Sequence, residues 1–373
     1  MRGRGFGVPL MGRIWMKNMM RCLVVLFVAL VATACTSSMQ DSLVRSIAVN
    51  QLSDVSDPTD FDGMQALVCG AGSPLPSRDA AGPCIAVLAA GKIWIVDAGS
   101  GAAENLQVWN LPGQKIAGVL LTHFHSDHIA EVPDVKLARW VGGASTPMPV
   151  YGPEGVGEVT AGYNRAYRQS HQYRVDHHGA DFIPPEVAEL APHPIGIRKG
   201  DPEGKTIVVL EEDGLRITAT KVDHFPVDPA VAYRFDYKGR SVTISGDTEK
   251  SDALTKLARG SDVFFHEALA DHVVRIMSEA ATEVGADRPA KITADIPDYH
   301  TSPVEVAEIA NEADAKLLIY YHLVPYPNNF MLERIFMRGV SDVRPDGAML
   351  GFDGLLIRLP PNSKEIEIDE LEG

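Results

Sequence analysis

The chain has 373 residues, of which 45% are hydrophobic and 22% charged, a balance typical of folded domains and not of disordered chains. Its formal net charge is −15, and the first 34 residues hold five basic and no acidic side chains, so the remainder carries −20. Because so acidic a body repels nucleic acid and anionic membrane surfaces, we expect neither nucleic acid nor a bare lipid surface as a partner.

The N-terminus has the pattern of an export signal. Basic residues up to Arg21 precede an apolar run at residues 22–32, which is too short to span a bilayer comfortably. Small residues then lead to Cys35, as in a bacterial lipoprotein cleavage site. We therefore expect a signal peptide at 1–34, lipidation of Cys35 and a periplasmic protein anchored to a bacterial membrane. A soluble secreted protein is the alternative.

Two cysteines remain after the leader and the anchor are set aside. Cys69 and Cys84 form an even pair in a chain predicted to be exported, so we expect a disulfide, with two buried free thiols as the alternative. The bond would close a loop rich in glycine, proline and serine and stabilise the fold by about 3 kcal/mol.

The elements follow in chain order after a polar tether at 35–61. One domain is expected over 62–360, followed by an acidic, solvated tail at 361–373. Apolar runs and alternation predict strands at 64–68, 84–89, 92–96, 118–121, 215–222, 231–237, 241–245, 263–265, 317–321 and 351–359, with another ending at 150–151. Helices are expected at 102–112, 152–167 and 251–259 and from residue 303. Residues 168–205 lack periodicity and are predicted to form a loop over a site, while their histidines are expected to be surface or hydrogen-bonding groups.

The most informative stretch follows the strand at 118–121. It places His123, His125, Asp127 and His128 within six positions, in the pattern H-x-H-x-D-H. His123 and His125 project the same way if the backbone is extended, and the next residues lie on a turn. Imidazoles and a carboxylate suit zinc or a related divalent ion, and four ligands so close together indicate two metals.

Four later residues share one position relative to the predicted strands. His224, Asp247, His266 and His322 each lie just past the carboxyl end of a short apolar strand. Side chains at several strand ends converge at one edge of a layered α/β fold, where sites usually form. The sequence therefore predicts one composite site.

Together these stretches resemble a metallo-β-lactamase-fold hydrolase, of the branch that holds ribonuclease Z and the secreted metallo-type arylsulfatases. The resemblance covers roughly residues 62–358 in family order. It is carried by residues 70–74, 97–99, 123–128, 151–155, 224, 245–248, 266–268, 300–302 and 322. It implies an αββα four-layer sandwich.

The resemblance also implies roles for single residues. One metal would be held by His123, His125 and His224, and a second by Asp127, His128 and His322, with Asp247 bridging them. The expected cofactor is two Zn²⁺, with Mn²⁺ or iron as alternatives, sharing a hydroxide that acts as the nucleophile. Asp127, His266 and His300 are the expected catalytic side chains. The alternatives are a structural partner of a ligand for His266 and a helix-cap neighbour for His300.

The chain also departs from the family. Ribonuclease Z has a tRNA-gripping arm between the third histidine ligand and the bridging aspartate, whereas only 22 residues separate His224 from Asp247 here. Flavodiiron oxidoreductases have glutamate where this chain has His125, which favours zinc over two irons. Persulfide dioxygenases keep the first motif but use one iron, and metal analysis would distinguish them.

We therefore expect a binuclear zinc hydrolase of a small-molecule phosphodiester or sulfate ester, without nucleic acid and with a homodimer left open. The alternatives are a lactone or β-lactam hydrolase of the same fold and a non-catalytic metal- or ligand-binding lipoprotein.

Overall fold

A computed structural model describes residues 37–53 and 57–371. The chain divides into two compact units, residues 1–57 and 58–373. In the first unit the described element is helix α2 (Ser37–Ser53), so the segment predicted as a tether is helical there. The predicted signal peptide and Cys35 lie outside the described residues. Within those residues no helix has both the length and the apolarity needed to cross a bilayer.

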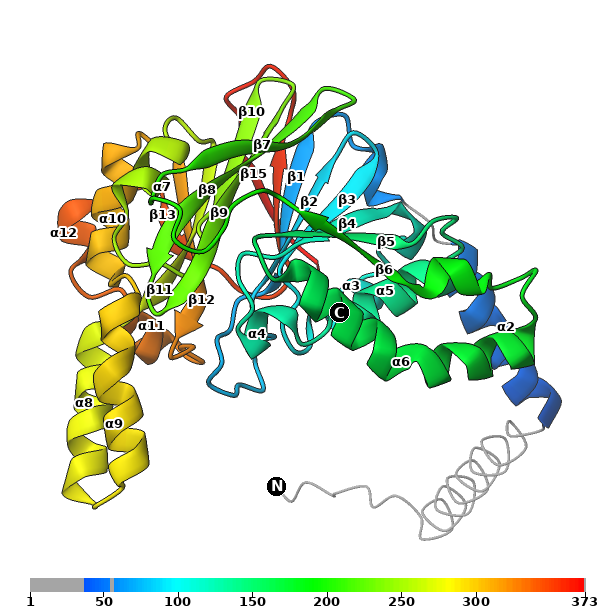
Figure 1. Cartoon of the computed structure of the whole chain (residues 1–373), viewed down its shortest axis with the longest axis horizontal. Coiled ribbons are helices and arrows are strands. Elements are labelled where there is room, and N and C mark those ends of the chain that lie inside the picture. The colour runs from blue at the N-terminus through cyan, green and yellow to red at the C-terminus, as the bar shows by residue number, and fades with distance from the viewer. Residues whose placement is uncertain (1–36, 54–56, 372–373) are drawn as a thin grey trace, which may run out of the picture. The chain divides into compact units, whose positions relative to one another are not determined.

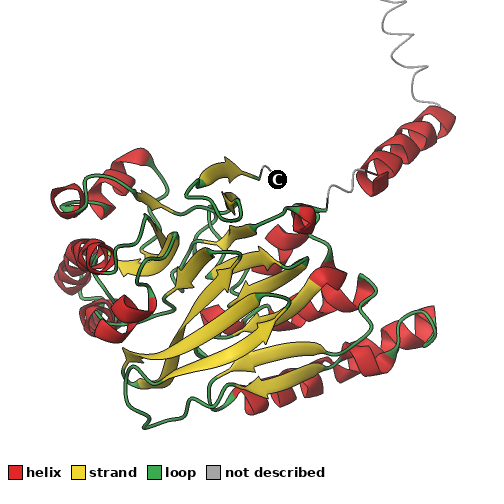
Figure 2. Cartoon of the chain, turned by 90° about the horizontal axis from the view of Figure 1, so that it is seen from above, coloured by secondary structure: helices red, strands yellow, loops and turns green. Residues whose placement is uncertain are grey.

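Two mixed β-sheets form the interior of the second unit, and helices cover their outer faces (Figure 1, Figure 2). The first sheet has the order β15 (Glu367–Glu370), β14 (Leu355–Leu359), β1 (Met64–Gly70), β2 (Cys84–Ala89), β3 (Lys92–Val96), β4 (Ile116–Leu120), β5 (Met148–Gly152), β6 (Leu190–Pro194). The second sheet has the order β13 (Ala348–Leu350), β12 (Leu317–Val324), β11 (Val263–Leu269), β10 (Arg240–Ile244), β9 (Val227–Tyr237), β8 (Leu215–His224), β7 (Thr206–Glu212). The layered α/β sandwich predicted from the sequence is confirmed.

The helices divide between the two sheets by position in the chain. Those inserted in the first half are α3 (Ala102–Val108), α4 (Ser126–Ile129), α5 (Val132–Val141) and α6 (Val156–His178). Those of the second half are α7 (Asp252–Leu257), α8 (Asp271–Glu283), α9 (Asp287–Asp295), α10 (Pro303–Glu312), α11 (Phe330–Phe336) and α12 (Val340–Val343). Helices α8 and α9 form a hairpin that projects from the domain (Figure 1).

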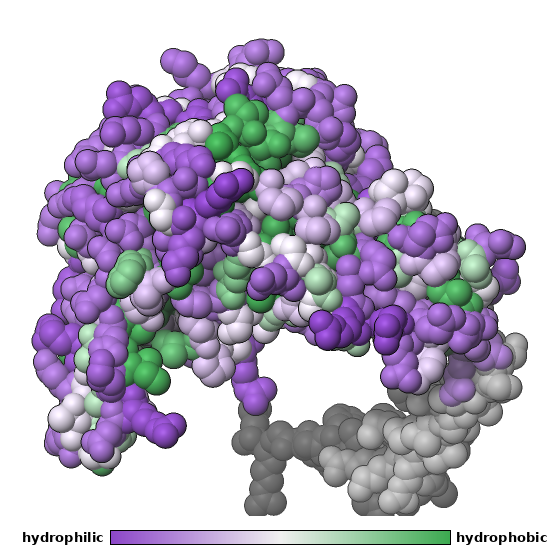
Figure 3. All heavy atoms as spheres, viewed as in Figure 1, coloured by the Kyte–Doolittle hydropathy of each residue, from purple (hydrophilic) through white to green (hydrophobic). Residues whose placement is uncertain are grey.

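Three apolar layers follow from strand alternation. Alternate residues of β11 show the rule: Val263 and Phe265 pack between the sheets, whereas Phe264 and Ala268 pack under the helices beside α10. A third layer lies between the first sheet and α3 and α5. The face seen in Figure 3 is mostly hydrophilic, and its most prominent apolar patch lies near the top, over the edge strand β7.

Three segments differ from the sequence-based prediction. Helix α6 continues to His178 through residues predicted as a loop. The sequence does not reveal this part of the helix, because α6 buries only Val156, Thr160 and His171 and so lacks an apolar stripe. Residues 271–295 form the α8–α9 hairpin where no element was predicted. The acidic tail supplies β15, an edge strand whose four residues are exposed and which pairs with β14 through its backbone.

Candidate metal centre

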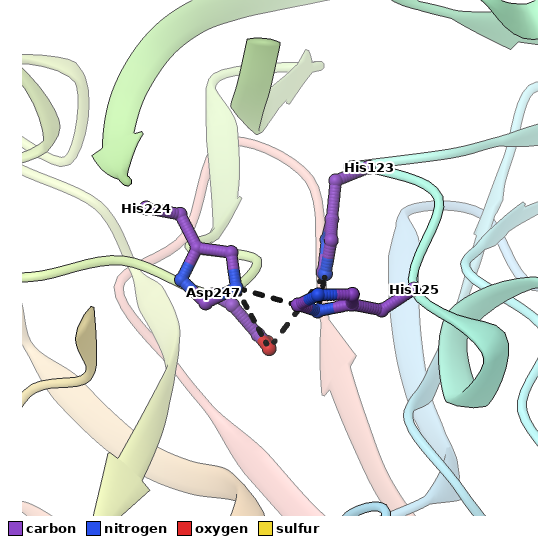
Figure 4. Close-up of side chains that lie close together, drawn as sticks. All are labelled: His123, His125, His224 and Asp247. Carbon is purple, nitrogen blue, oxygen red and sulfur yellow. Dashed lines mark hydrogen bonds and ion pairs between the residues drawn. The ribbon is translucent and has the colours of Figure 1, made fainter. Parts of the chain in front are cut away.

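The two sheets each deliver one half of the site. From the first sheet, β4 ends at Leu120 and the following turn carries His123 and His125 into α4. From the second sheet, His224 closes β8, and Asp247 follows β10. The side chains from these separate elements point toward one another (Figure 4).

The first group of potential ligands is His123, His125, His224 and Asp247, whose ligand atoms all lie within 4.8 Å of one another. His123 Nε2 is 2.9 Å from His125 Nδ1, and His224 Nε2 is 3.4 Å from the same atom. Asp247 Oδ2 lies 3.8 Å from Nε2 of both His123 and His224. Three imidazole nitrogens and one carboxylate oxygen therefore converge.

The second group is Asp127, His128 and His322. Asp127 Oδ2 lies 3.3 Å from His322 Nε2 and 3.5 Å from His128 Nε2. Asp247 also faces this group, with Oδ1 3.3 Å from His128 Nε2 and Oδ2 3.4 Å from His322 Nε2. One carboxylate thus stands between the two groups, and the structure brings together all seven residues that the sequence selected as ligands.

The donor atoms fit metal ions better than they fit one another. His128 Nε2 and Asp247 Oδ1 are buried and, although only 3.3 Å apart, are not aligned to hydrogen-bond each other or another group among the described residues, a costly arrangement unless something else satisfies them. Burial lowers the pKa of His123 well below its usual value and that of His224 to about 4, so both imidazoles are neutral and offer a lone pair. Burial raises the pKa of Asp247, but His322 and His128 outweigh it and hold that pKa well below the usual value. For His123, His224 and Asp247 these are the protonation states that bind a divalent cation, whereas burial lowers the pKa of His128 but Asp247 and Asp97 outweigh it and raise that pKa.

Asp97 orients the first histidine turn. Its Oδ2 lies 2.8 Å from His128 Nδ1 and accepts the Thr122 hydroxyl at 2.8 Å, and Oδ1 accepts the Thr122 N–H. The Thr122 hydroxyl is in turn 3.1 Å from His123 Nδ1. Asp97 adopts a left-handed φ of 58°, a strained conformation typical of functional sites. Asp223, which directly precedes the potential ligand His224, does not share this role, because its carboxylate accepts the Phe225 N–H.

Two glycines allow the close approach of these turns. A Cβ on Gly99 would lie 2.5 Å from the Asp127 carbonyl oxygen, and one on Gly246 would lie 2.8 Å from Thr122 Cβ. Gly246 also has a φ of +61°, which favours glycine. These glycines let Asp127 and Asp247 reach the centre.

His300 lies at the centre with a partner that the sequence did not reveal. Its ring is 5.3 Å from that of His224, and Nδ1 is 3.1 Å from Glu267 Oε1. Burial alone would lower the pKa of His300, but the Glu267 carboxylate, with Asp247, raises it to about 9. Glu267 is fully buried and also accepts the Thr301 N–H. His300 is therefore held as a cation beside the potential ligands.

His266 is not brought to the centre. It is fully buried on β11, its ring packs against Phe264, and Nδ1 lies 2.7 Å from the Glu267 carbonyl oxygen. Because successive residues of a strand face opposite ways, Glu267 faces the centre and His266 faces the helices. The structure thus places Glu267 where the sequence-based hypothesis had placed a catalytic His266.

The remaining predicted residues lie elsewhere. Cys69 and Cys84 form a buried disulfide between β1 and β2. His171 contacts Lys136, and His193 packs on Tyr151. His177 and His178 contact each other at the end of α6.

Comparison with known proteins identifies the family of the chain. A family model described as the beta-lactamase superfamily domain matches residues 94–323. Ribonuclease Z of Mycobacterium bovis is 33% identical over 265 residues, which are 70% of this chain and 86% of the relative, and that of Mycolicibacterium gilvum is 33% identical over 267 residues, 70% and 85% of the two chains.

Solved structures share the fold. A metallo-β-lactamase fold protein from Bacillus subtilis covers 79% of this chain and 99% of its own, at a TM-score of 0.55 and 20% identity. The short form of human tRNase Z also covers 79% and 99%, at a TM-score of 0.56 and 19% identity.

The fold and the clustered ligands define a hydrolase of the metallo-β-lactamase superfamily with a site suited to metal. Within it, the chain belongs to the ribonuclease Z branch.

One sequence-based prediction is wrong as a result. We expected a small-molecule ester as the partner and excluded nucleic acid, but the relatives that match most of this chain are named as ribonucleases. The exclusion rested on net charge, which averages over the whole surface and says nothing of how cations are distributed on it.

Proposed function

We propose that this chain is a phosphodiesterase that hydrolyses RNA with two zinc ions held at the candidate metal centre. The observation that carries the proposal is the position of Asp247, whose two oxygens face both ligand groups at 3.3–3.8 Å. Membership of the ribonuclease Z branch supports RNA as the substrate.

His123, His125 and His224 would hold one ion, Asp127, His128 and His322 the other, and Asp247 both. When bound, such a pair supplies an activated water at neutral pH and polarises the phosphoryl group. Asp97 keeps the His128 ring in place by accepting its Nδ1 proton, and the Tyr299 carbonyl does the same for His224 at 2.8 Å.

His300 holds the proton that the leaving group needs. Its Nδ1 bonds Glu267, so Nε2 is the nitrogen left to face substrate. Because the pKa of His300 is raised to about 9, the ring is charged at neutral pH. It can stabilise negative charge on the phosphoryl oxygens and donate a proton to the departing alkoxide.

Export and lipidation of Cys35 remain part of the proposal, with extracytoplasmic RNA as the substrate pool. Palmitate labelling of cells that express the full chain, compared with Cys35→Ala, tests the anchor. Absence of label in the wild-type protein would remove it.

The test of function is cleavage of end-labelled single-stranded and hairpin RNAs by the zinc-loaded protein. We expect cleavage that a chelator abolishes and added zinc restores, with p-nitrophenyl sulfate as a counter-screen for sulfate esters. Turnover of the sulfate without cleavage of any RNA would overturn the proposal.

A further inference from the structure

The outer face of the second sheet carries a polar groove far from the metal centre. Helix α7 has only six residues and packs its Leu254 against Val222 and Ala230, near the carboxyl end of β8. The other end of β8, around Arg216, has no such cover, and Arg216 is exposed. Two adjoining cavities of about 640 and 420 Å³ lie along this face and share Arg234 as a common wall. We call them together the cationic groove.

Basic side chains dominate the cationic groove. Seven basic and four acidic side chains line it, although the whole chain carries a net charge of −15. Two of the four acidic side chains already form ion pairs with basic side chains. Asp236 is held by Arg234 at 3.0 Å, and the buried Asp262 by Arg240 at 3.1 Å and by Lys316.

Three basic side chains in the groove form no such ion pair among the described residues. Arg216, Lys256 and Arg259 are exposed and make no salt bridge with any side chain in the part of the chain that the structure describes. Arg216 has two acidic cross-strand neighbours: Glu211 on β7, which does not line the cavities, and Asp236 on β9, which lines them and pairs with Arg234. With Glu203 and Asp252 also in its lining, the groove holds three more basic than acidic side chains on an otherwise acidic molecule, an electrostatic footprint typical of a polyanion site.

The groove lies along strand β8, whose last residue belongs to the metal centre. Arg216 lies near the start of β8 and His224 at its end, so eight residues of one strand separate them, roughly 26 Å at about 3.3 Å per residue. A nucleic-acid strand advances roughly 3.4 Å per nucleotide, so about eight nucleotides span that distance. The α8–α9 hairpin beside the centre carries more acidic than basic side chains and offers the backbone no comparable surface.

We propose that the cationic groove docks the phosphate backbone of the RNA substrate, some eight nucleotides away from the scissile bond. This inference rests on the proposed function. Arg216, Lys256 and Arg259 would contact phosphates without reading sequence. The groove would thus hold the RNA as the inserted arm of ribonuclease Z holds tRNA.

The test compares two charge-reversal variants with equal change in net charge. The first is R216E/K256E/R259E in the groove, and the control is R275E/R288E/K291E on the hairpin, all at exposed positions. Binding of a 20-nucleotide, cleavage-resistant phosphorothioate RNA is measured by fluorescence anisotropy across salt concentrations. Hydrolysis of bis(p-nitrophenyl) phosphate, which is too short to reach the groove, reports the state of the metal centre.

We expect the groove variant to bind RNA at least tenfold more weakly than wild type, and the control to bind within twofold of it. Loss of three phosphate contacts should also lower the slope of log K against log salt by about 2. RNAs of four nucleotides, which cannot span the two sites, should not distinguish the variants.

Equal RNA binding by the groove variant and wild type, or equal losses in both variants, would overturn the inference. So would binding to phosphatidylglycerol vesicles in place of RNA, which would make the groove a membrane contact. A wild-type protein that binds RNA through the groove but hydrolyses neither RNA nor the small diester would leave the docking site standing and refute the proposed function instead.

Discussion

Replacing Glu267 by glutamine tests whether a buried ion pair sets the working pH of the centre. The substitution removes the negative charge beside His300 but keeps an oxygen to accept the Thr301 N–H, so the local fold should survive. The pKa of His300 is about 9, against an ordinary value of 6.5. The difference corresponds to roughly 3 kcal/mol.

The direction of the shift follows from the surroundings of His300. Burial on its own lowers the pKa of a histidine, so the entire rise comes from the carboxylates, Glu267 first and Asp247 after it. Without the Glu267 charge, the pKa of His300 should fall to or below 6.5. At pH 8 the protonated fraction would then drop from about 90% to a few per cent, which predicts a roughly 30-fold loss of kcat.

The assay is the pH profile of kcat for RNA cleavage by the zinc-loaded protein between pH 5.5 and 10. We expect the alkaline limb of the profile to move at least two pH units toward acid in Glu267→Gln. Glu249→Gln is the matched control, because Glu249 is a partly exposed acid after β10 and, in the described part of the chain, no hydrogen bond or ion pair joins its side chain to His300. An unmoved limb in a folded, metal-loaded Glu267→Gln protein, or an equal shift in the control, would refute the reasoning.

Three further predictions follow from contacts around the centre. Asp97→Asn places an amide where two buried donors, the Thr122 hydroxyl and His128 Nδ1, need an acceptor. Zinc affinity should therefore fall about 10- to 100-fold in a competitive chelator titration. Unchanged affinity would contradict the role of Asp97. Gly99→Ala sets a Cβ 2.5 Å from the Asp127 carbonyl oxygen, so kcat for RNA should fall, while Gly162→Ala, within helix α6 where a Cβ meets nothing within 4 Å, keeps activity; equal activity of the two variants would argue against the close approach. Replacing both Cys69 and Cys84 by alanine opens a cross-link between residues 15 apart and should lower the free energy of unfolding by about 3 kcal/mol in urea; a loss below about 1 kcal/mol would show that the disulfide does not constrain the unfolded chain.

The sequence predicts much of the centre because its chemistry is local. His123, His125, Asp127 and His128 occupy one short stretch, and His224, Asp247 and His322 each follow an apolar strand. Strand ends meet at one edge, so the convergence of these seven residues could be expected before the fold was known.

Glu267 and Asp97 could not be found in that way. The sequence shows His266 and Glu267 side by side, and only the orientation of β11 decides which of them faces the centre. The value of Asp97 lies in its contact with His128, 31 residues away, which no local pattern records.

The larger omissions have a similar origin. Helix α6 and strand β15 bury little apolar surface and so leave no periodic pattern. The net charge led to a wrong exclusion of nucleic acid, because a sum over the chain does not show where charges lie. An exposed cluster of basic side chains such as Arg216, Lys256 and Arg259 is lost in that sum.

The central claim is tested most directly by measuring the metal content of the protein and checking in parallel that it is folded. Elemental analysis of the purified, zinc-loaded protein should give two zinc ions per chain. Asp247→Ala, which removes the one carboxylate that faces both ligand groups, should retain fewer than one while its circular dichroism spectrum is unchanged. A wild-type chain that binds no metal, or an Asp247→Ala protein that still holds two ions, would contradict the account.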